Sequence, residues 1–164
     1  MKRFILGALS VAVLAGCTSI DKDYSNDPKY SFMVGTRYRT KEDTVVYRNR
    51  GEKKLEIERY GGDPEIPKKE EMQPVPFRFY NSVILGVLPA GSEFQIKKVK
   101  YEGSVSGAYV YYYAAVTSST AAEWVGKEMN TTWLAQRPKN LPSGEDGPPV
   151  FKPELVEEIP AAGK

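Results

Sequence analysis

Apolar and polar positions alternate with a period of two along most of the chain after Tyr30. This alternation is typical of β-strands with one buried face, and the Val, Ile, Tyr, Phe and Thr residues that dominate these segments favour pleated sheets. The pattern predicts strands over Met33–Tyr38, Thr44–Arg48, Lys54–Tyr60, Phe77–Tyr80, Val83–Leu88, Glu93–Tyr101, Ala108–Thr117 and Met129–Leu134. No long helical period is present, and a short helix or turn is expected near Thr120–Trp124. The fold class is therefore predicted to be all-β.

Two segments that are rich in proline and glycine interrupt or follow this pattern, at residues 61–76 and 137–164. A 16-residue loop inside a compact domain is unusual and is often functional or disordered, and we predict disorder here. In the tail, Leu155 and Ile159 have helical spacing after Pro153, which predicts one or two helical turns over Pro153–Ile159. Such a turn could dock on the domain or on a partner, or remain disordered.

The first 16 residues have the three parts of an export signal. Lys2 and Arg3 are positively charged, Phe4–Leu14 is an apolar run of 11 residues, and the small residues Ala15 and Gly16 follow. An apolar run of roughly 7–15 residues fits a signal peptide, whereas a membrane-spanning helix needs about 20. Residues 1–16 are therefore predicted to be cleaved.

The tetrapeptide Leu14-Ala15-Gly16-Cys17 resembles the lipobox of bacterial lipoproteins. The resemblance implies that the Cys17 thiol is alkylated with diacylglycerol, that cleavage precedes Cys17, and that the new amine is acylated. Each buried methylene contributes about 0.8 kcal/mol, so two or three acyl chains would hold the protein on the membrane stably. In enterobacterial lipoproteins an Asp after the cysteine favours the inner membrane, so Thr18 predicts the outer membrane, with the protein facing the periplasm.

Polar residues follow the cysteine, and residues 17–29 are predicted to form a lipidated, flexible tether. A stretched tether of this length spans about 40 Å, which would keep the domain near the membrane surface. The β domain is then expected over residues 30–136, with the loop 61–76 inside it and the tail 137–164 after it.

Removal of the signal changes the charge of the chain. The precursor has 23 basic and 21 acidic side chains, and the signal removes Lys2 and Arg3 but no acid, so the mature chain is formally neutral. A neutral chain lacks the strong positive field that recruits nucleic acid, so no nucleic-acid partner is expected.

Residue types that several catalytic and metal sites require are missing. The chain has no histidine, and Cys17 is its only cysteine, so it cannot form a Ser-His-Asp or Cys-His nucleophile or a zinc site of His and Cys ligands. Glu56, Glu58 and Glu93 alternate with apolar residues, which predicts a solvated strand face. We therefore expect no catalytic residue, metal or cofactor, and a protein that is not an enzyme.

The segment Val83-Ile84-Leu85-Gly86-Val87-Leu88-Pro89-Ala90-Gly91-Ser92-Glu93-Phe94-Gln95-Ile96-Lys97-Lys98-Val99 resembles the middle of a bacterial SH3-like small β-barrel. Such domains carry an apolar strand, a Leu-Pro-x-Gly turn and a second strand in which Phe94 and Ile96 would share one face. The resemblance covers about Val34 to Leu134, and an OB-like barrel or a small β-sandwich remains an alternative. It implies a domain that binds peptides, peptidoglycan or other envelope proteins.

Three tyrosines are the side chains most suited to binding. Alternation places Tyr109, Tyr111 and Tyr113 on one face of a strand, and the opposite face has the better core composition: Val110, Tyr112, Ala114 and Val116. Outward tyrosines offer flat apolar area and a hydroxyl, which suits sugars or extended peptides. The alternative is that these rings pack under the loop 61–76 or under the tail.

Three functional hypotheses follow. The first is a non-enzymatic, membrane-anchored binding module for an envelope protein or peptidoglycan, which uses Tyr109, Tyr111 and Tyr113. The second is a structural accessory subunit of an envelope or secretion machine, with the loop and the tail as its contacts. The third is a glycan hydrolase that works through carboxylates, for which a pair of buried carboxylates across a cleft would be needed.

Overall fold

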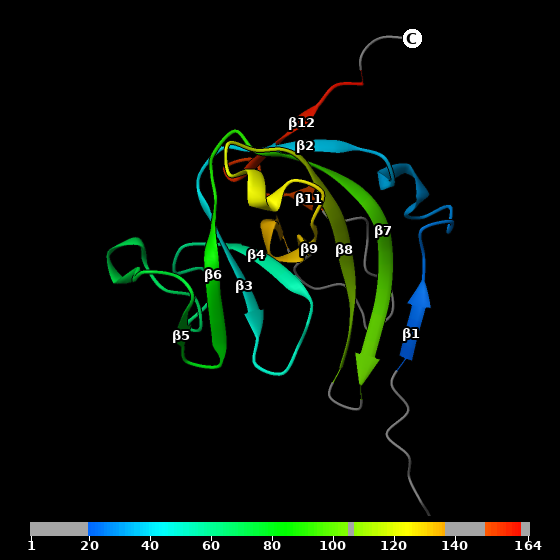
Figure 1. Ribbon diagram of the computed structural model, residues 1–164. Helices are drawn as coiled ribbons and strands as arrows, with labels where there is room; N and C mark the ends of the chain where they lie inside the picture. Colours follow the sequence, from blue (N-terminus) through cyan, green and yellow to red (C-terminus); the bar gives the residue numbers. More distant parts are fainter. Residues whose placement is uncertain (1–19, 105–106, 137–149, 162–164) are drawn as a thin grey trace, which may run out of the picture.

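The computed structural model describes residues 20–104, 107–136 and 150–161, which form strands and short 3-10 helices (Figure 1). The strands are β1 (Ile20–Asp23), β2 (Arg37–Thr40), β3 (Thr44–Asn49), β4 (Leu55–Arg59), β5 (Phe77–Phe79), β6 (Ser82–Leu88), β7 (Glu93–Ser104), β8 (Gly107–Ser118), β9 (Glu128–Asn130), β10 (Ala135–Gln136), β11 (Val150–Phe151) and β12 (Val156–Ile159). The 3-10 helices are η1 (Ser31–Met33), η2 (Lys69–Glu71), η3 (Ala122–Trp124) and η4 (Thr132–Leu134). The described part contains no α-helix, which confirms the all-β prediction.

Ten strands form one sheet that curls into a half-barrel (Figure 1). Their order is β12-β2-β7-β8-β9-β4-β3-β6-β5, with β1 also paired to β7, while β10 and β11 form a separate pair. Neighbouring strands are antiparallel except β4 and β9. The SH3-like architecture stays a prediction.

The main core lies on the inner face of this curled sheet. On β8 the predicted inward set is confirmed, because Val110, Tyr112, Ala114 and Val116 are all buried. Trp124 closes the core against Gly86, where an added Cβ would lie 2.7 Å from the Trp124 ring atom Cζ2. The Trp124 indole N–H also donates to the Val87 carbonyl at 2.9 Å, so the strand needs a glycine to admit this ring.

Several predicted element boundaries change at the ends of strands. The strand predicted from Met33 begins only at Arg37, because η1 precedes it. The strand predicted over Met129–Leu134 ends at Asn130, and the 3-10 helix η4 follows it. The short helix expected near Thr120–Trp124 is confirmed as η3.

The prediction that residues 61–76 are disordered is wrong. The segment folds back on itself, with the Gly61 N–H donating to the Pro67 carbonyl at 3.1 Å, and Ile66 is buried. It covers a second apolar cluster on the outer face of the sheet, which consists of Val45, Tyr47, Ile66 and Ile84 with Tyr60, Met72, Phe77, Phe79 and Trp133 packed against them. Both faces of β3 are apolar, and this loop removes the outer face from water.

The prediction of a flexible tether over residues 17–29 is wrong for residues 20–29. Residues Ile20 to Asp23 form β1 on the edge of β7, and Tyr24 stacks between Tyr30 and Tyr101 with ring centroids 5.6 Å apart in each pair. Backbone pairing and ring stacking hold this polar segment to the sheet. The domain therefore begins three residues after Cys17.

The helical turn predicted over Pro153–Ile159 is also wrong, because residues Val156 to Ile159 form strand β12. This strand pairs with β2, which satisfies backbone groups at an edge that would otherwise be open. Leu155 and Val156 are buried in the main core, so this part of the tail belongs to the domain. Residues 137–149 of the predicted tail lie outside the described residues.

Candidate functional site

The tyrosines of β8 share one face of the strand, as predicted, but differ greatly in exposure. Tyr109 is 50% exposed, Tyr111 is partly buried, and only 5% of Tyr113 is exposed. The rings of Tyr109 and Tyr111 meet edge to face with centroids 6.5 Å apart. The prediction that all three tyrosines face outward is therefore wrong for Tyr113. The rings do not belong to the apolar cluster beneath the loop 61–76.

A small polar cluster explains the burial of Tyr113. Its hydroxyl donates to Glu102 Oε1 at 2.9 Å, and the ammonium groups of Lys54 and Lys98 lie 5.5 and 5.4 Å from its ring centroid. Lys54 Nζ also pairs with Glu102 Oε2 at 2.6 Å. Burial raises the pKa of Tyr113 to about 12, so the phenol stays protonated and donates to the carboxylate. This residue connects neighbouring strands and is not available to a ligand.

Glu56 and Glu58 were predicted to lie on a solvated face, and this prediction is wrong. Each carboxylate-bearing residue is only 6% exposed. Alternation correctly places both side chains on the face of β4 that is opposite to the Ile57 side chain. However, β4 is an interior strand of the sheet, and its outer face is covered as well.

Glu56 is the acceptor of a buried hydrogen-bond network. Its Oε2 accepts from the Trp133 indole N–H and from the Tyr47 hydroxyl at 3.2 Å, and its Oε1 accepts from Asn49 Nδ2 at 3.1 Å. Burial raises the pKa of Glu56, while the hydrogen bonds from Trp133 and Tyr47 oppose this shift. Each donor holds the carboxylate in place, which is how a structural network behaves.

Glu58 has an environment that disfavours its charge. Burial raises its pKa to about 7, and the charge of Asp63 acts in the same direction, while Lys152 opposes it. Glu56 and Glu58 are two residues apart on one strand, so they do not face each other across a cleft. In the described residues no group of three or more Asp, Glu or Cys side chains could hold a metal ion.

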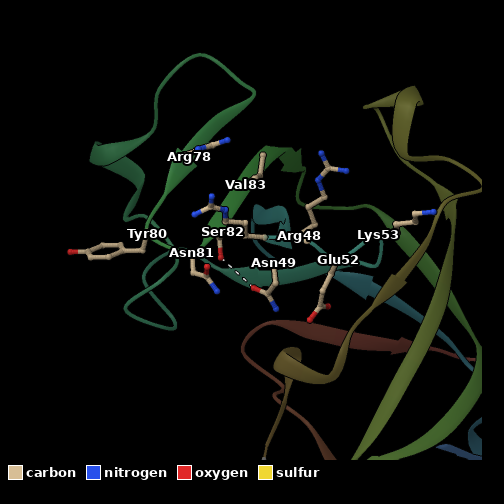
Figure 2. A pocket seen from close by; sticks show the side chains of 11 residues that line it. Arg48, Asn49, Glu52, Lys53, Arg78, Tyr80, Asn81, Ser82 and Val83 are labelled. Carbon is tan, nitrogen blue, oxygen red and sulfur yellow. Dashed lines mark hydrogen bonds between the residues drawn. The ribbon is translucent and has the colours of Figure 1, made fainter. Parts of the chain in front are cut away.

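A hollow of about 430 Å³ lies where β3 and β5 end and β6 begins, at the side of the β3–β4 and β5–β6 turns (Figure 2). Its lining residues are Arg48, Asn49, Arg50, Gly51, Glu52, Lys53, Arg78, Tyr80, Asn81, Ser82 and Val83. Four of these side chains are cationic and one is anionic. All five charged side chains are exposed.

Strand register brings these cations together. Val83 of β6 pairs with Arg48 of β3 on one side and with Arg78 of β5 on the other, so the three side chains share one face. Figure 2 shows the guanidinium groups of Arg48 and Arg78 on the same side of the hollow. The two turns are joined because the Arg50 N–H donates to the Asn81 carbonyl at 2.9 Å.

The cations of the hollow have no acidic partner within the described part of the chain. None of Arg48, Arg50, Lys53 and Arg78 forms an ion pair there, whereas Lys54 beside them is paired. Tyr80, which has a positive φ of 49°, projects away from the hollow and is 80% exposed (Figure 2). This arrangement can bind phosphate or carboxylate oxygens, because arginine presents paired donors to them.

Sequence reasoning did not find this hollow. Arg48 and Arg78 lie at or near the ends of two predicted strands, and the neutral net charge of the mature chain gives no sign of a local basic site. Their gathering depends on the pairing of β3 with β6 and of β6 with β5.

Comparison with known proteins identifies the N-terminal segment. Residues 1–18 match the family described as prokaryotic membrane lipoprotein lipid attachment site. No curated protein matches the chain, and no solved structure matches it. Cys17, the predicted lipid-bearing residue, lies outside the described residues. Within the described residues, no helix is long and apolar enough to span a bilayer. The match indicates a lipid-anchored lipoprotein of the cell envelope that is made with a signal peptide.

Proposed function

We propose that this lipoprotein is a non-enzymatic binding module that takes an acidic component of the cell envelope, from an envelope protein or from peptidoglycan. Its lipid on Cys17 would hold it to the outer membrane on the periplasmic side, and its domain would work as SH3-like binding domains do. The observation that carries the proposal is the hollow with four exposed cations that lack acidic partners among the described residues.

Charge separation supports this choice of surface. The mature chain is formally neutral, yet the lining of the hollow has three more basic than acidic side chains. Other parts of the surface neutralise neighbouring cations with a shared acid, as where Arg37 and Arg39 both bind Glu93. Cations that have no acidic partner in the protein can donate their hydrogen bonds to a bound anionic ligand.

Tyr109 and Tyr111 supply an aromatic surface nearby. Tyr109 pairs with Glu102, and Glu102 binds Lys54, which follows the turn that lines the hollow. Edge-to-face tyrosines beside a charged pair suit a sugar ring or an extended peptide. We include Tyr109 and Tyr111 in the proposed surface and leave out Tyr113, which is buried.

The test uses the full lipoprotein in living cells, with crosslinking and mass spectrometry to identify its neighbours. Arg48→Gln with Arg78→Gln should remove the main crosslinked partner and weaken retention on purified sacculi, because two of the three bidentate arginine donors are lost. Lys127→Gln removes an exposed charge elsewhere and serves as the control. Unchanged partners and unchanged retention in the double variant, with the fold intact, would contradict the proposal.

A further inference from the structure

The position of β1 determines where the chain from the lipid-bearing cysteine joins the domain. Ile20 pairs with Gly103, near the end of β7, so the chain enters the domain at the end of the sheet where β7 turns into β8. Cys17 lies three residues earlier, and three residues span at most about 11 Å. The lipid-bearing residue is therefore confined to the vicinity of this end.

The hollow lies at the same end. In Figure 1 the β3–β4 turn, the β5–β6 turn, the last residues of β7 and the start of β1 all lie at the lower end of the molecule. Contacts connect them in turn. Asp21 pairs with Glu102, Lys54 Nζ binds Glu102 Oε2 at 2.6 Å, and the β3–β4 turn that precedes Lys54 is hydrogen-bonded to the β5–β6 turn.

This lower end has the side chains that bind a lipid surface. Four exposed cations surround the hollow. Two exposed tyrosines are connected to the β3–β4 turn. Tyr80 belongs to the β5–β6 turn, which is hydrogen-bonded to the β3–β4 turn, and Tyr109 pairs with Glu102, which binds Lys54 just after that turn. Lysine and arginine near a bilayer are attracted to anionic headgroups, and tyrosine concentrates at the level of the headgroups. An acyl chain combined with a basic patch is a known two-part membrane anchor.

We propose that the lower end of the domain lies on the membrane that holds its own anchor, with lipid phosphates in the basic hollow. The inference rests on the anion-binding hollow of the proposed function, but its occupant is lipid phosphate in place of an acidic group of a protein or of peptidoglycan. The short connection to Cys17 favours lipid over a distant partner, because it keeps the hollow close to the bilayer, where the local concentration of lipid headgroups is high. The hollow then sets the orientation of the domain, and the remaining faces stay free for proteins.

The experiment measures which end of the lipidated, full-length mature protein approaches the bilayer. The lipid occupies the only natural cysteine, so an introduced cysteine can be labelled alone with a fluorophore. Asn81→Cys and Ala90→Cys form a matched pair at exposed turns on opposite ends of β6, which are about 20 Å apart. Each protein is placed in vesicles of phosphatidylethanolamine and phosphatidylglycerol that contain a lipid with a nitroxide headgroup, and in phosphatidylcholine vesicles with the same quencher.

We expect strong quenching at position 81 and weak quenching at position 90 in anionic vesicles, with a smaller difference in phosphatidylcholine. Adding Arg50→Gln and Lys53→Gln should reduce the preference for position 81 by about tenfold or more in the ratio of docked to undocked protein, whereas Lys127→Gln should leave it unchanged. Equal quenching at both positions in anionic vesicles would overturn the inference. If quenching is equal but Arg48→Gln with Arg78→Gln still abolishes capture of sacculi or of the crosslinked partner, the inference fails and the proposed function stands. If neither responds, both fail.

Discussion

Replacing Glu58 by glutamine should make the protein more stable above neutral pH and should flatten the pH dependence of its stability between about pH 4.5 and about pH 7. The folded domain raises the pKa of this carboxyl from 4.5 to about 7, so the folded state binds a proton that the unfolded chain has released. Its contribution is fully favourable below pH 4.5, and it is lost as the pH rises through about 7. Glutamine keeps the shape and carries no charge at any of these pH values.

The magnitude follows from the two pKa values. One pKa unit corresponds to 1.36 kcal/mol, so the difference between the folded and unfolded pKa of Glu58 corresponds to about 3 kcal/mol of free energy of unfolding. Partial screening by solvent reduces this contribution to about 1–2 kcal/mol. Urea unfolding of the mature chain with Cys17→Ser, followed by tryptophan fluorescence, would measure the free energy of unfolding across this pH range. Glu70→Gln, at an exposed position, is the matched control and should follow the parent. A Glu58→Gln variant with the same pH dependence as the parent would refute the reasoning.

Three further predictions concern the core, the carboxylate network and the anchor. Gly86→Ala should destabilise the domain by about 1–3 kcal/mol, measured by urea unfolding, because its Cβ would collide with Trp124. Trp133→Phe should cost about 1–3 kcal/mol in the same assay, since the buried Glu56 carboxylate loses a donor. Cys17→Ser should move the protein to the soluble fraction and abolish labelling with fatty acid, whereas a variant that still pellets with membranes would place the anchor elsewhere.

Alternation along single strands was enough to predict the inner face of the sheet. Val110, Tyr112, Ala114 and Val116 were assigned inward from their composition, and the structure confirms them. The same rule failed for Glu56 and Glu58, because it assumes that the second face of a strand is solvated. In this protein a loop and the indole of Trp133 cover that face, and only long-range packing decides this.

Pairing between distant segments explains the other errors. β1 and β12 are polar, with sequences that have little strand character of their own, and both exist because β7 and β2 offer unpaired backbone edges. The strand that accepts such a segment lies far away in the chain: Asp21 pairs with Glu102, which is 81 residues later, and Val156 pairs with Thr40, which is 116 residues earlier. A local pattern carries no information about such a partner.

The corrected N-terminus changes what the anchor can do. A flexible tether of the predicted length would let the domain turn freely and reach about 40 Å from the bilayer, so any face could meet a partner. With β1 paired from Ile20 onward, only Thr18 and Ser19 separate the lipid-bearing cysteine from the sheet, and free rotation of the domain is restricted. An end held that close must be compatible with headgroups, and unpaired cations with exposed tyrosines meet this requirement. The short connection and the basic hollow therefore have one common explanation, which neither the sequence pattern nor the net charge could provide.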